Sequence, residues 1–248
     1  NANITEIETM EQPDETIKDF IDMIVSNKNL KLSRLRFRSA EYDEHFVSYL
    51  TSLIQHIPTL VHLAIEDAMT QRGLTEFIDN FNTCAEYERI TTLSLSGTPN
   101  IDVSKLIRFA PNIKSLDLCR CDLDISSILP YFAKSQIEVL NLSENKAVEE
   151  IDNNTQIPPT LSKLIVSNVD WQNQMNYFNF LKVISVSQET MKNGSLYLDI
   201  SNIHVTDDVD VTISAMKFLS FSRLSVLIFN GNTINEHFLA FLEKCKSI

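Results

Sequence analysis

The chain has 248 residues, of which 44% are hydrophobic and 22% are charged, and its formal net charge is −12 at pH 7. The hydrophobic share is ordinary for a folded protein. The acidic balance argues against a general nucleic-acid binder and against attachment to an anionic membrane, since both need a basic surface. No apolar run reaches the length of a bilayer span, so we expect no membrane insertion.

A short apolar phrase recurs along the chain: an apolar residue, any two residues, an apolar residue, any one residue, and a third apolar residue. Complete copies occupy residues 32–37, 60–65, 90–95, 113–118, 137–142, 161–166 and 224–229, and degenerate copies begin at Ile4 and Leu196. The central residues of successive copies are 23 to 34 residues apart. This regularity predicts one stacked strand per repeat, each burying the same apolar residues against its neighbours.

The segments between the strands carry apolar residues at helical spacing, which predicts a helix on each return path. The first begins near Asp14, a candidate N-cap, and the following stripes shorten towards the middle of the chain. In chain order the apolar stripes are Ile17, Phe20, Ile21, Ile24 and Val25; Phe46, Leu50, Leu53 and Ile54; Leu74, Phe77, Ile78 and Phe81; Val103, Leu106 and Ile107; and Ile125, Ile128, Leu129 and Phe132. We further predict a long helix over 171–186 with Trp171 in the core, and a last helix over 236–246 carrying Phe238, Leu239 and Leu242.

Three phrases extend into a longer motif: "IKSLDLCRC" (113–121), "IEVLNLSEN" (137–145) and "LSVLIFNGN" (224–232). In these the chain resembles the leucine-rich repeat family, and its long, uneven repeats are similar to the ribonuclease-inhibitor-like subclass. The family places Asn or Cys at the ninth position to hydrogen-bond neighbouring backbone. Here that position is occupied elsewhere by Ala40, Ala68, Thr98, Val169 and Ile203, which predicts looser turns.

The expected fold is therefore α/β: a curved horseshoe-shaped solenoid of about eight to nine repeats, with a concave parallel sheet and convex helices, because helices are wider than strands. We expect a single domain over residues 1–248 that forms a piece of a larger protein. We also expect a monomer or weak dimer.

No residue pattern indicates a catalytic centre, a metal site or a cofactor. The four glycines cannot build a phosphate loop, a nucleophile elbow or a dinucleotide fingerprint. No histidine has a second histidine or cysteine at helical ligand spacing. The absence of these patterns predicts a protein without enzymatic activity. The four cysteines lack disulfide or metal-ligand spacing, and secreted members of the family that the chain resembles usually carry disulfide-closed caps, so we predict a cytoplasmic protein.

The residues between the apolar positions of each strand must point to the concave side. They yield the candidate partner-binding residues Arg34, Arg36, Arg38, His62, Glu66, Asp117, Asn141, Lys163, Tyr197 and Asp199. The row of three arginines is unusual in an acidic chain. Either the arginines pair with Glu66 and Glu8 on flanking strands, or they capture an acidic segment of a protein partner.

These features favour a protein–protein interaction scaffold that binds a partner on its concave face. The phrase "SLYLDISN" (195–202) is similar to one in the cytoskeletal linker family that joins capping protein, the Arp complex and myosin, which suggests cytoskeleton regulation. The alternatives are a regulator of small GTPases of the activating type, a substrate receptor of a ubiquitin ligase, and a bacterial effector that mimics a host scaffold.

Overall fold

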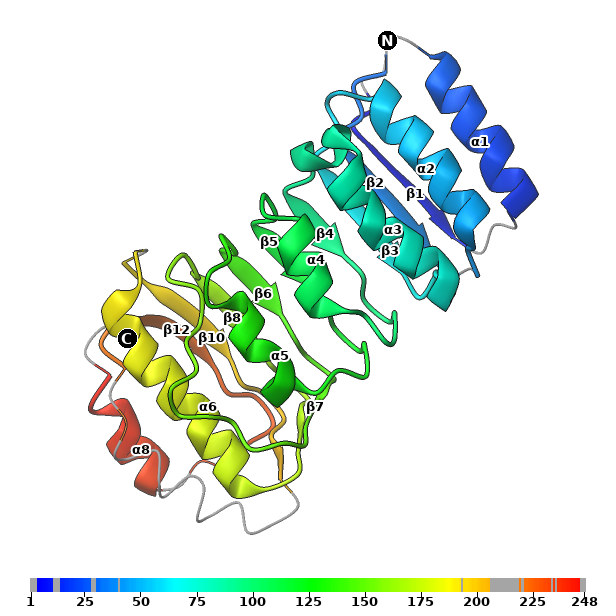
Figure 1. Ribbon diagram of the computed structural model, residues 1–248. Coiled ribbons are helices and arrows are strands. Elements are labelled where there is room, and N and C mark those ends of the chain that lie inside the picture. The colour runs from blue at the N-terminus through cyan, green and yellow to red at the C-terminus, as the bar shows by residue number, and fades with distance from the viewer. Residues whose placement is uncertain are drawn as a thin grey trace. The chain divides into compact units, whose positions relative to one another are not determined.

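The computed structural model describes residues 4–10, 14–27, 30–39, 41–192, 194–205, 219, 221–232, 234 and 236–245. The chain divides into two compact units, Asn1–Cys121 and Asp122–Ile248. Each unit is built from parallel strands connected through helices or turns, as the recurring phrase predicts (Figure 1). No helix within the described ranges is both long and apolar enough to span a membrane.

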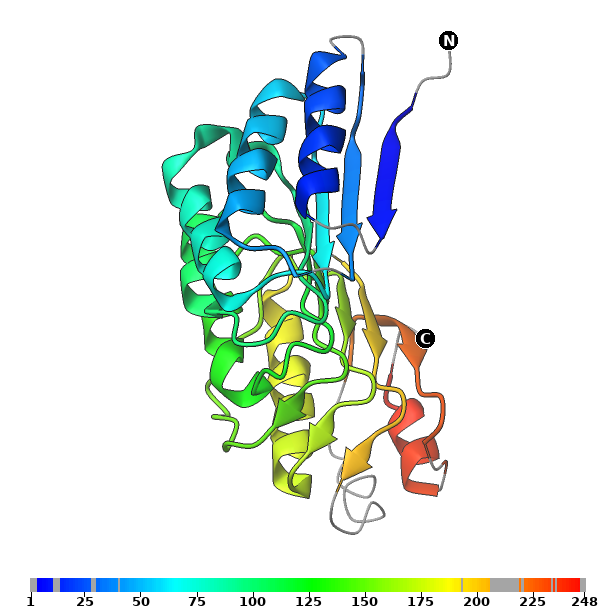
Figure 2. The same ribbon diagram turned by 90° about the vertical axis from the view of Figure 1, so that its right-hand side faces the viewer.

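The first unit contains a parallel sheet whose strands follow one another in chain order. Its strands are β1 (Glu6–Met10), β2 (Arg34–Arg38), β3 (His62–Glu66), β4 (Thr92–Ser94) and β5 (Ser115–Asp117). Its helices are α1 (Asp14–Ser26), α2 (Glu44–His56), α3 (Gln71–Thr83), the 3-10 helix η1 (Ala85–Arg89) and α4 (Val103–Phe109). The helices lie on one side of the strands, which leaves the other side of the sheet uncovered (Figure 2).

The second unit contains two parallel sheets. The larger has the order β6 (Val139–Asn141), β8 (Lys163–Ile165), β10 (Leu196–Asp199) and β12 (Leu224–Ile228). The smaller has the order β11 (His204–Val205), β9 (Asp170–Trp171) and β7 (Lys146–Ala147). The helices are α5 (Ile125–Phe132), α6 (Gln174–Ser187), the 3-10 helix η2 (Gln188–Thr190) and α8 (Glu236–Leu242).

The predicted alternation along the strands is confirmed in both units. The central residue of each phrase from Leu35 to Leu198 is at most 1% exposed, whereas the residues on either side of it are mostly half-buried or exposed. Aromatic side chains from the helices complete the core, and Phe46 of α2 packs edge-on against Phe37 of β2 at 4.9 Å between ring centroids. Burial of one face of each strand holds the strand register, because a shift by one residue would expose the whole apolar set.

In eight of the described repeats, the strand of the phrase ends in a turn that the sequence did not reveal. Two residues after the last apolar residue of the phrase, the backbone adopts a left-handed conformation. In the first unit these residues are Ser39, Asp67, Gly97 and Arg120, and in the second they are Glu144, Asn168, Asn202 and Gly231. Only two of the eight are glycines, so six repeats hold a side chain in a conformation that favours glycine.

The Asn or Cys at the ninth position hydrogen-bonds neighbouring backbone where it is present. Asn145 accepts from the Leu123 amide at 3.0 Å and donates to the Leu142 carbonyl at 2.9 Å, and Asn232 accepts from the Ile203 amide at 2.6 Å. Cys121 donates its thiol proton to the Leu95 carbonyl at 3.2 Å, and burial raises its pKa to about 12. Ala68 and Val169 fill this position as buried apolar residues, and Ala40 lies outside the described residues. The looser turns remain a prediction.

Two predicted helices differ from the structure. The helix expected over 171–186 starts only at Gln174, because the preceding residues pair with the smaller sheet: the Asp170 amide donates to the Asn145 carbonyl at 2.9 Å. Asn173 then caps α6 by accepting from the Asn176 amide. Trp171 is buried as expected, but on β9, where it contacts Tyr177.

The last helix ends at Leu242, and its inward face differs from the prediction. Phe238 and Phe241 are buried, whereas Leu239 is 53% exposed. Phe241 packs edge-on against Phe221 at 5.4 Å between ring centroids, which orients this helix.

Candidate functional site

The uncovered side of the sheet in the first unit, here called the open face, presents two complete rows of side chains. In strand order the rows are Glu6, Arg34, His62, Thr92 and Ser115, and then Glu8, Arg36, Ala64, Ser94 and Asp117. A third row pairs Met10 with Arg38 and Glu66. The parallel register thus brings together residues that are up to 109 positions apart in the sequence.

Glu66 is the most buried carboxylate on this face, and it binds residues of both neighbouring strands. Its side chain is only 11% exposed and accepts a hydrogen bond from Arg38 Nε at 2.8 Å and another from Ser94 Oγ at 2.8 Å. Arg38 also pairs with Glu8 at 3.2 Å. The hydrogen bond from Arg38 to Glu66, and then the charge of Glu66, raise the pKa of Arg38. Pairing of Arg38 with both predicted glutamates is therefore present in the structure.

Arg34 and Arg36 are held less tightly than Arg38. Arg34 Nη1 lies 3.9 Å from Glu6 Oε2, and Arg36 Nε lies 3.9 Å from Glu66 Oε1. Both distances exceed that of a hydrogen bond. The side chains of Arg34 and Arg36 are 57% and 39% exposed, so solvent screens these pairs and each stabilises the fold little.

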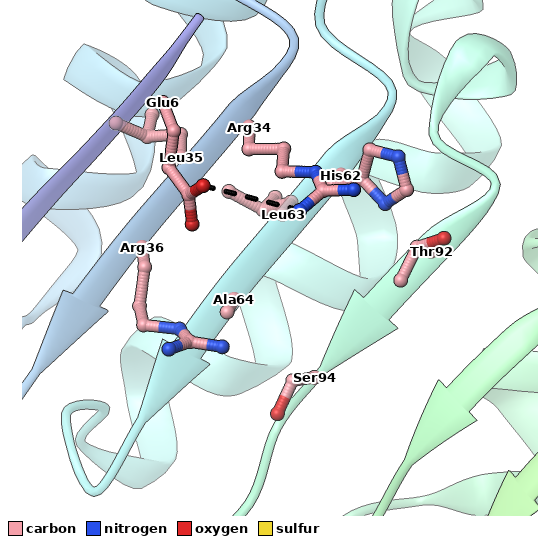
Figure 3. Close-up of a pocket in the computed structure, with 9 residues that line it drawn as sticks. All are labelled: Glu6, Arg34, Leu35, Arg36, His62, Leu63, Ala64, Thr92 and Ser94. Atoms are coloured by element: carbon pink, nitrogen blue, oxygen red, sulfur yellow. Dashed lines mark ion pairs between the residues drawn. The ribbon is translucent and has the colours of Figure 1, made fainter.

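A pocket of about 280 Å³ lies between these residues on the open face. Figure 3 shows Arg34 and Arg36 on one side, Thr92 and Ser94 on the other, and Ala64 between them. The remaining lining residues are Glu6, Leu35, His62 and Leu63. The hollow exists because Ala64 contributes a single methyl group, whereas its register neighbour Arg36 and its strand neighbours His62 and Glu66 have long side chains.

His62 borders this pocket as a neutral imidazole at pH 7. Burial lowers its pKa, and the nearby positive charge of Arg34 lowers the pKa further, while Glu6 opposes both effects. The side chain can therefore donate one hydrogen bond and accept another.

The other predicted residue of the first unit, Asp117, supports its own turn. Its Oδ1 accepts from the Cys119 amide at 3.0 Å. Asn141 and Asp199 in the second unit do the same, accepting from the Ser143 and Ser201 amides at 3.1 and 3.0 Å. These three predicted side chains therefore each have a local structural role.

In the second unit Lys163 and Tyr197 are register neighbours. The ammonium of Lys163 lies 4.5 Å from the centroid of the Tyr197 ring, a favourable cation–π distance. The same sheet face carries apolar Val139, Ile165, Val226 and Ile228, of which Val226 is 38% exposed.

The structure brings Arg34, Arg36, Arg38, His62 and Glu66 together on one face of the first unit. Sequence reasoning named Glu8 of this strand but missed Glu6, which pairs with Arg34. It also missed the pocket above Ala64. A small residue signals a hollow only when its neighbours on adjacent strands are known.

One described group of side chains has the geometry of a metal site: Asp43, Glu44 and His45 at the start of α2. Other interactions already involve two of them. Asp43 accepts from the His45 amide at 2.8 Å as the helix cap, and Glu44 pairs with Arg72 at 2.9 Å. This arrangement is a capped, partly solvated helix start, and it offers no further residue to complete a metal site.

No protein-family model matches the sequence, and no curated protein matches it. Among solved structures, the chain is similar to the TLR13 chain in a crystal structure of the TLR13–ssRNA13 complex, with 15% identity and a TM-score of 0.38. That match covers 88% of this chain and 39% of the TLR13 chain, so this chain spans about two fifths of it. The leucine-rich repeat domain of APL1B is similar at 13% identity with a TM-score of 0.31, covering 90% of this chain and 74% of that domain.

The leucine-rich repeat fold assigned here follows from the repeats themselves. Each unit repeats a strand with a buried apolar phrase, a left-handed turn, and a return path that packs behind the sheet. The ribonuclease-inhibitor-like subclass remains a prediction.

Proposed function

We propose that this chain is a protein-binding scaffold and that the open face of the first unit is its docking surface. The observation that carries the proposal is the pair Arg34 and Arg36, which project beside a pocket and have only long ion pairs to Glu6 and Glu66. Arginine is enriched at protein interfaces because its planar guanidinium forms paired hydrogen bonds with a carboxylate.

The three arginines differ in how tightly the fold binds them, and this difference supports an acidic segment as the docking partner. Arg38 belongs to the fold, since it binds Glu66 and Glu8 at hydrogen-bonding distance. Arg34 and Arg36 keep donors available to a partner, because their ion-pair distances of 3.9 Å are too long for hydrogen bonds. We therefore assign partner capture to Arg34 and Arg36.

The test is affinity capture from a cell lysate with the immobilised chain, followed by quantitative mass spectrometry. The double variant R34Q/R36Q removes two positive charges without placing new carboxylates beside Glu66. We expect it to lose partner proteins by tenfold or more, on the order of the loss from two charged hydrogen bonds. Its melting temperature should stay close to the unmodified chain, since exposed ion pairs contribute only about 0–1 kcal/mol.

A matched control is K18Q/R72Q on the helical side of the same unit. Lys18 pairs with Asp22 and Arg72 pairs with Glu44, so this variant also removes two charges and two surface ion pairs. It should retain the captured proteins. Equal recovery with R34Q/R36Q and the unmodified chain would contradict the assignment of the docking surface.

We place this scaffold in the cytoplasm, in keeping with its cysteine pattern, and cytoskeleton regulation is one process that it could serve. No described residue favours the alternatives of GTPase activation, substrate recruitment for a ubiquitin ligase, or effector mimicry. Stimulated phosphate release from a panel of small GTPases would favour the first of these alternatives over the scaffold.

A further inference from the structure

The pocket on the open face is small for a ligand site. Its volume of about 280 Å³ lies just below the range of about 300–1,000 Å³ that is usual for small-molecule sites. Its floor is the Ala64 methyl group, and Arg36 and Ser94 occupy the register positions on either side. A cofactor would find little room here, whereas a single side chain from a docked segment fits.

The charges around the pocket favour an anion. The lining residues include two arginines and one carboxylate, Glu6, while His62 is neutral at pH 7. Glu66 lies next to the pocket, but its oxygens already accept from Arg38 and Ser94. The lining therefore has a net charge of about +1 inside a chain whose net charge is −12.

The position of Glu6 indicates which anion fits. Its carboxylate lies beside the Arg34 guanidinium at 3.9 Å, on β1 at one side of the pocket (Figure 3). At 54% exposure this side chain can move aside at little cost. Glu6 thus shows that a carboxylate can be accommodated beside Arg34, and it also competes with any incoming carboxylate.

We propose that the pocket receives the carboxylate of a single Glu or Asp side chain from the acidic segment of a partner, between Arg34 and Arg36 and above Ala64. The incoming carboxylate displaces Glu6 from Arg34. A carboxylate is the group that already lies beside each guanidinium, Glu6 at Arg34 and Glu66 at Arg36, and its planar shape suits arginine. This inference rests on the proposed function and names the group that the docking surface recognises.

The test is fluorescence anisotropy of the full chain with labelled Gly/Ser peptides that carry a central Glu-Glu pair, a Gln-Gln pair or a single phosphoserine. We expect the Glu-Glu peptide to bind about tenfold more tightly than the Gln-Gln peptide, as expected for charge-assisted hydrogen bonds. Equal affinity of the two peptides would overturn the proposal. Tighter binding of the phosphoserine peptide would overturn the choice of a carboxylate.

The variant A64L separates a pocket from general attraction between charges, because it fills the hollow and leaves every charge in place. We expect it to reduce Glu-Glu peptide binding by tenfold or more, as when a buried charged contact is lost. The control S115L adds the same side chain to a half-buried position of β5 that does not line the pocket, and it should bind normally. Normal binding by A64L would overturn the pocket, and a thermal melt of each variant confirms that it is folded.

The variant E6Q tests the displacement step. Removing the competing carboxylate should strengthen Glu-Glu peptide binding by roughly two- to fivefold, the range expected from an exposed ion pair. Unchanged affinity would show that Glu6 does not compete. If the peptides fail to bind while R34Q/R36Q still loses its captured proteins, this inference fails and the proposed function stands. If that variant also keeps its captured proteins, both fail.

Discussion

At the scale of single residues, the left-handed turns connect the repeats through side chains as well as backbone. Asp67 reaches across Gly97 to Arg120, with 2.6 Å between the carboxylate and guanidinium atoms, although the two residues are 53 positions apart. Gly97 allows this reach, since a Cβ at its position would lie 1.8 Å from Asp67 Oδ1. Its φ of +73° independently favours glycine.

We predict that G97A destabilises the fold by about 1–3 kcal/mol, from left-handed strain together with displacement of Asp67. Urea unfolding measures this change in the free energy of unfolding. The double variant G97A/D67A separates the causes, because it removes the steric conflict and keeps the strain. An equal cost of G97A with and without Asp67 would show that the contact is irrelevant.

In the proposed binding mode, His62 should make peptide binding depend on pH. In the unliganded chain, burial and Arg34 lower the pKa of His62. Glu6 lies two strands away from His62, whereas a carboxylate bound in the pocket would lie beside His62. Exchange of Glu6 for the bound carboxylate should therefore favour the imidazolium, so binding should take up protons.

We therefore predict that affinity for the Glu-Glu peptide rises as pH falls from about 7.5 to about 5.5, where the Glu side chains of the peptide remain ionised. Anisotropy titrations at several pH values measure this trend. In H62Q the affinity should be nearly independent of pH across that range. A rise of the same size in H62Q would assign the effect to another group.

At the scale of helices and strands, two aspartates that cap helices differ in whether they also hydrogen-bond to a second segment of the chain. Asp102 caps α4 by accepting from the Lys105 amide at 2.9 Å and from Ser104 Oγ at 2.7 Å. Asp124 caps α5 through the Ser126 amide at 3.1 Å and also accepts from the Val148 amide at 3.0 Å and the Glu149 amide at 3.3 Å. Asp124 therefore joins its own helix to the following repeat.

We predict that D124A costs about 1–2 kcal/mol of stability, and that D102A costs about 1 kcal/mol or less, because only Asp124 also fixes a second segment. Chemical denaturation of both variants provides the comparison. D124N, which keeps one acceptor oxygen, should recover part of the loss. A larger cost for D102A than for D124A would contradict this reading of the two caps.

At the scale of the whole molecule, the apolar phrase was sufficient to predict parallel strands with return helices, since burial of every second residue is a direct consequence of a one-sided sheet. The phrase could not predict β7, β9 and β11, because strands of two residues carry no periodic signal. Trp171 was for this reason placed on a helix in the sequence-based prediction, although it lies on β9.

The candidate site was predictable only in part. The arginine row followed from strand alternation, and the pairing of Arg38 with Glu66 and Glu8 was one of the two interpretations considered. The different roles of the three arginines depend on differences of about one ångström between charged atoms. Such differences arise from the register of neighbouring strands and from Ser94, and no motif encodes them.

The uneven distances between phrases determine where this protein can change in length. Within a phrase, one inserted residue would turn all following apolar side chains of that strand towards solvent. The return paths already differ by up to eleven residues between repeats. Insertions, tags or grafted loops should therefore be tolerated in the loops that flank the return helices and rejected in the strands, which would leave the open face unchanged.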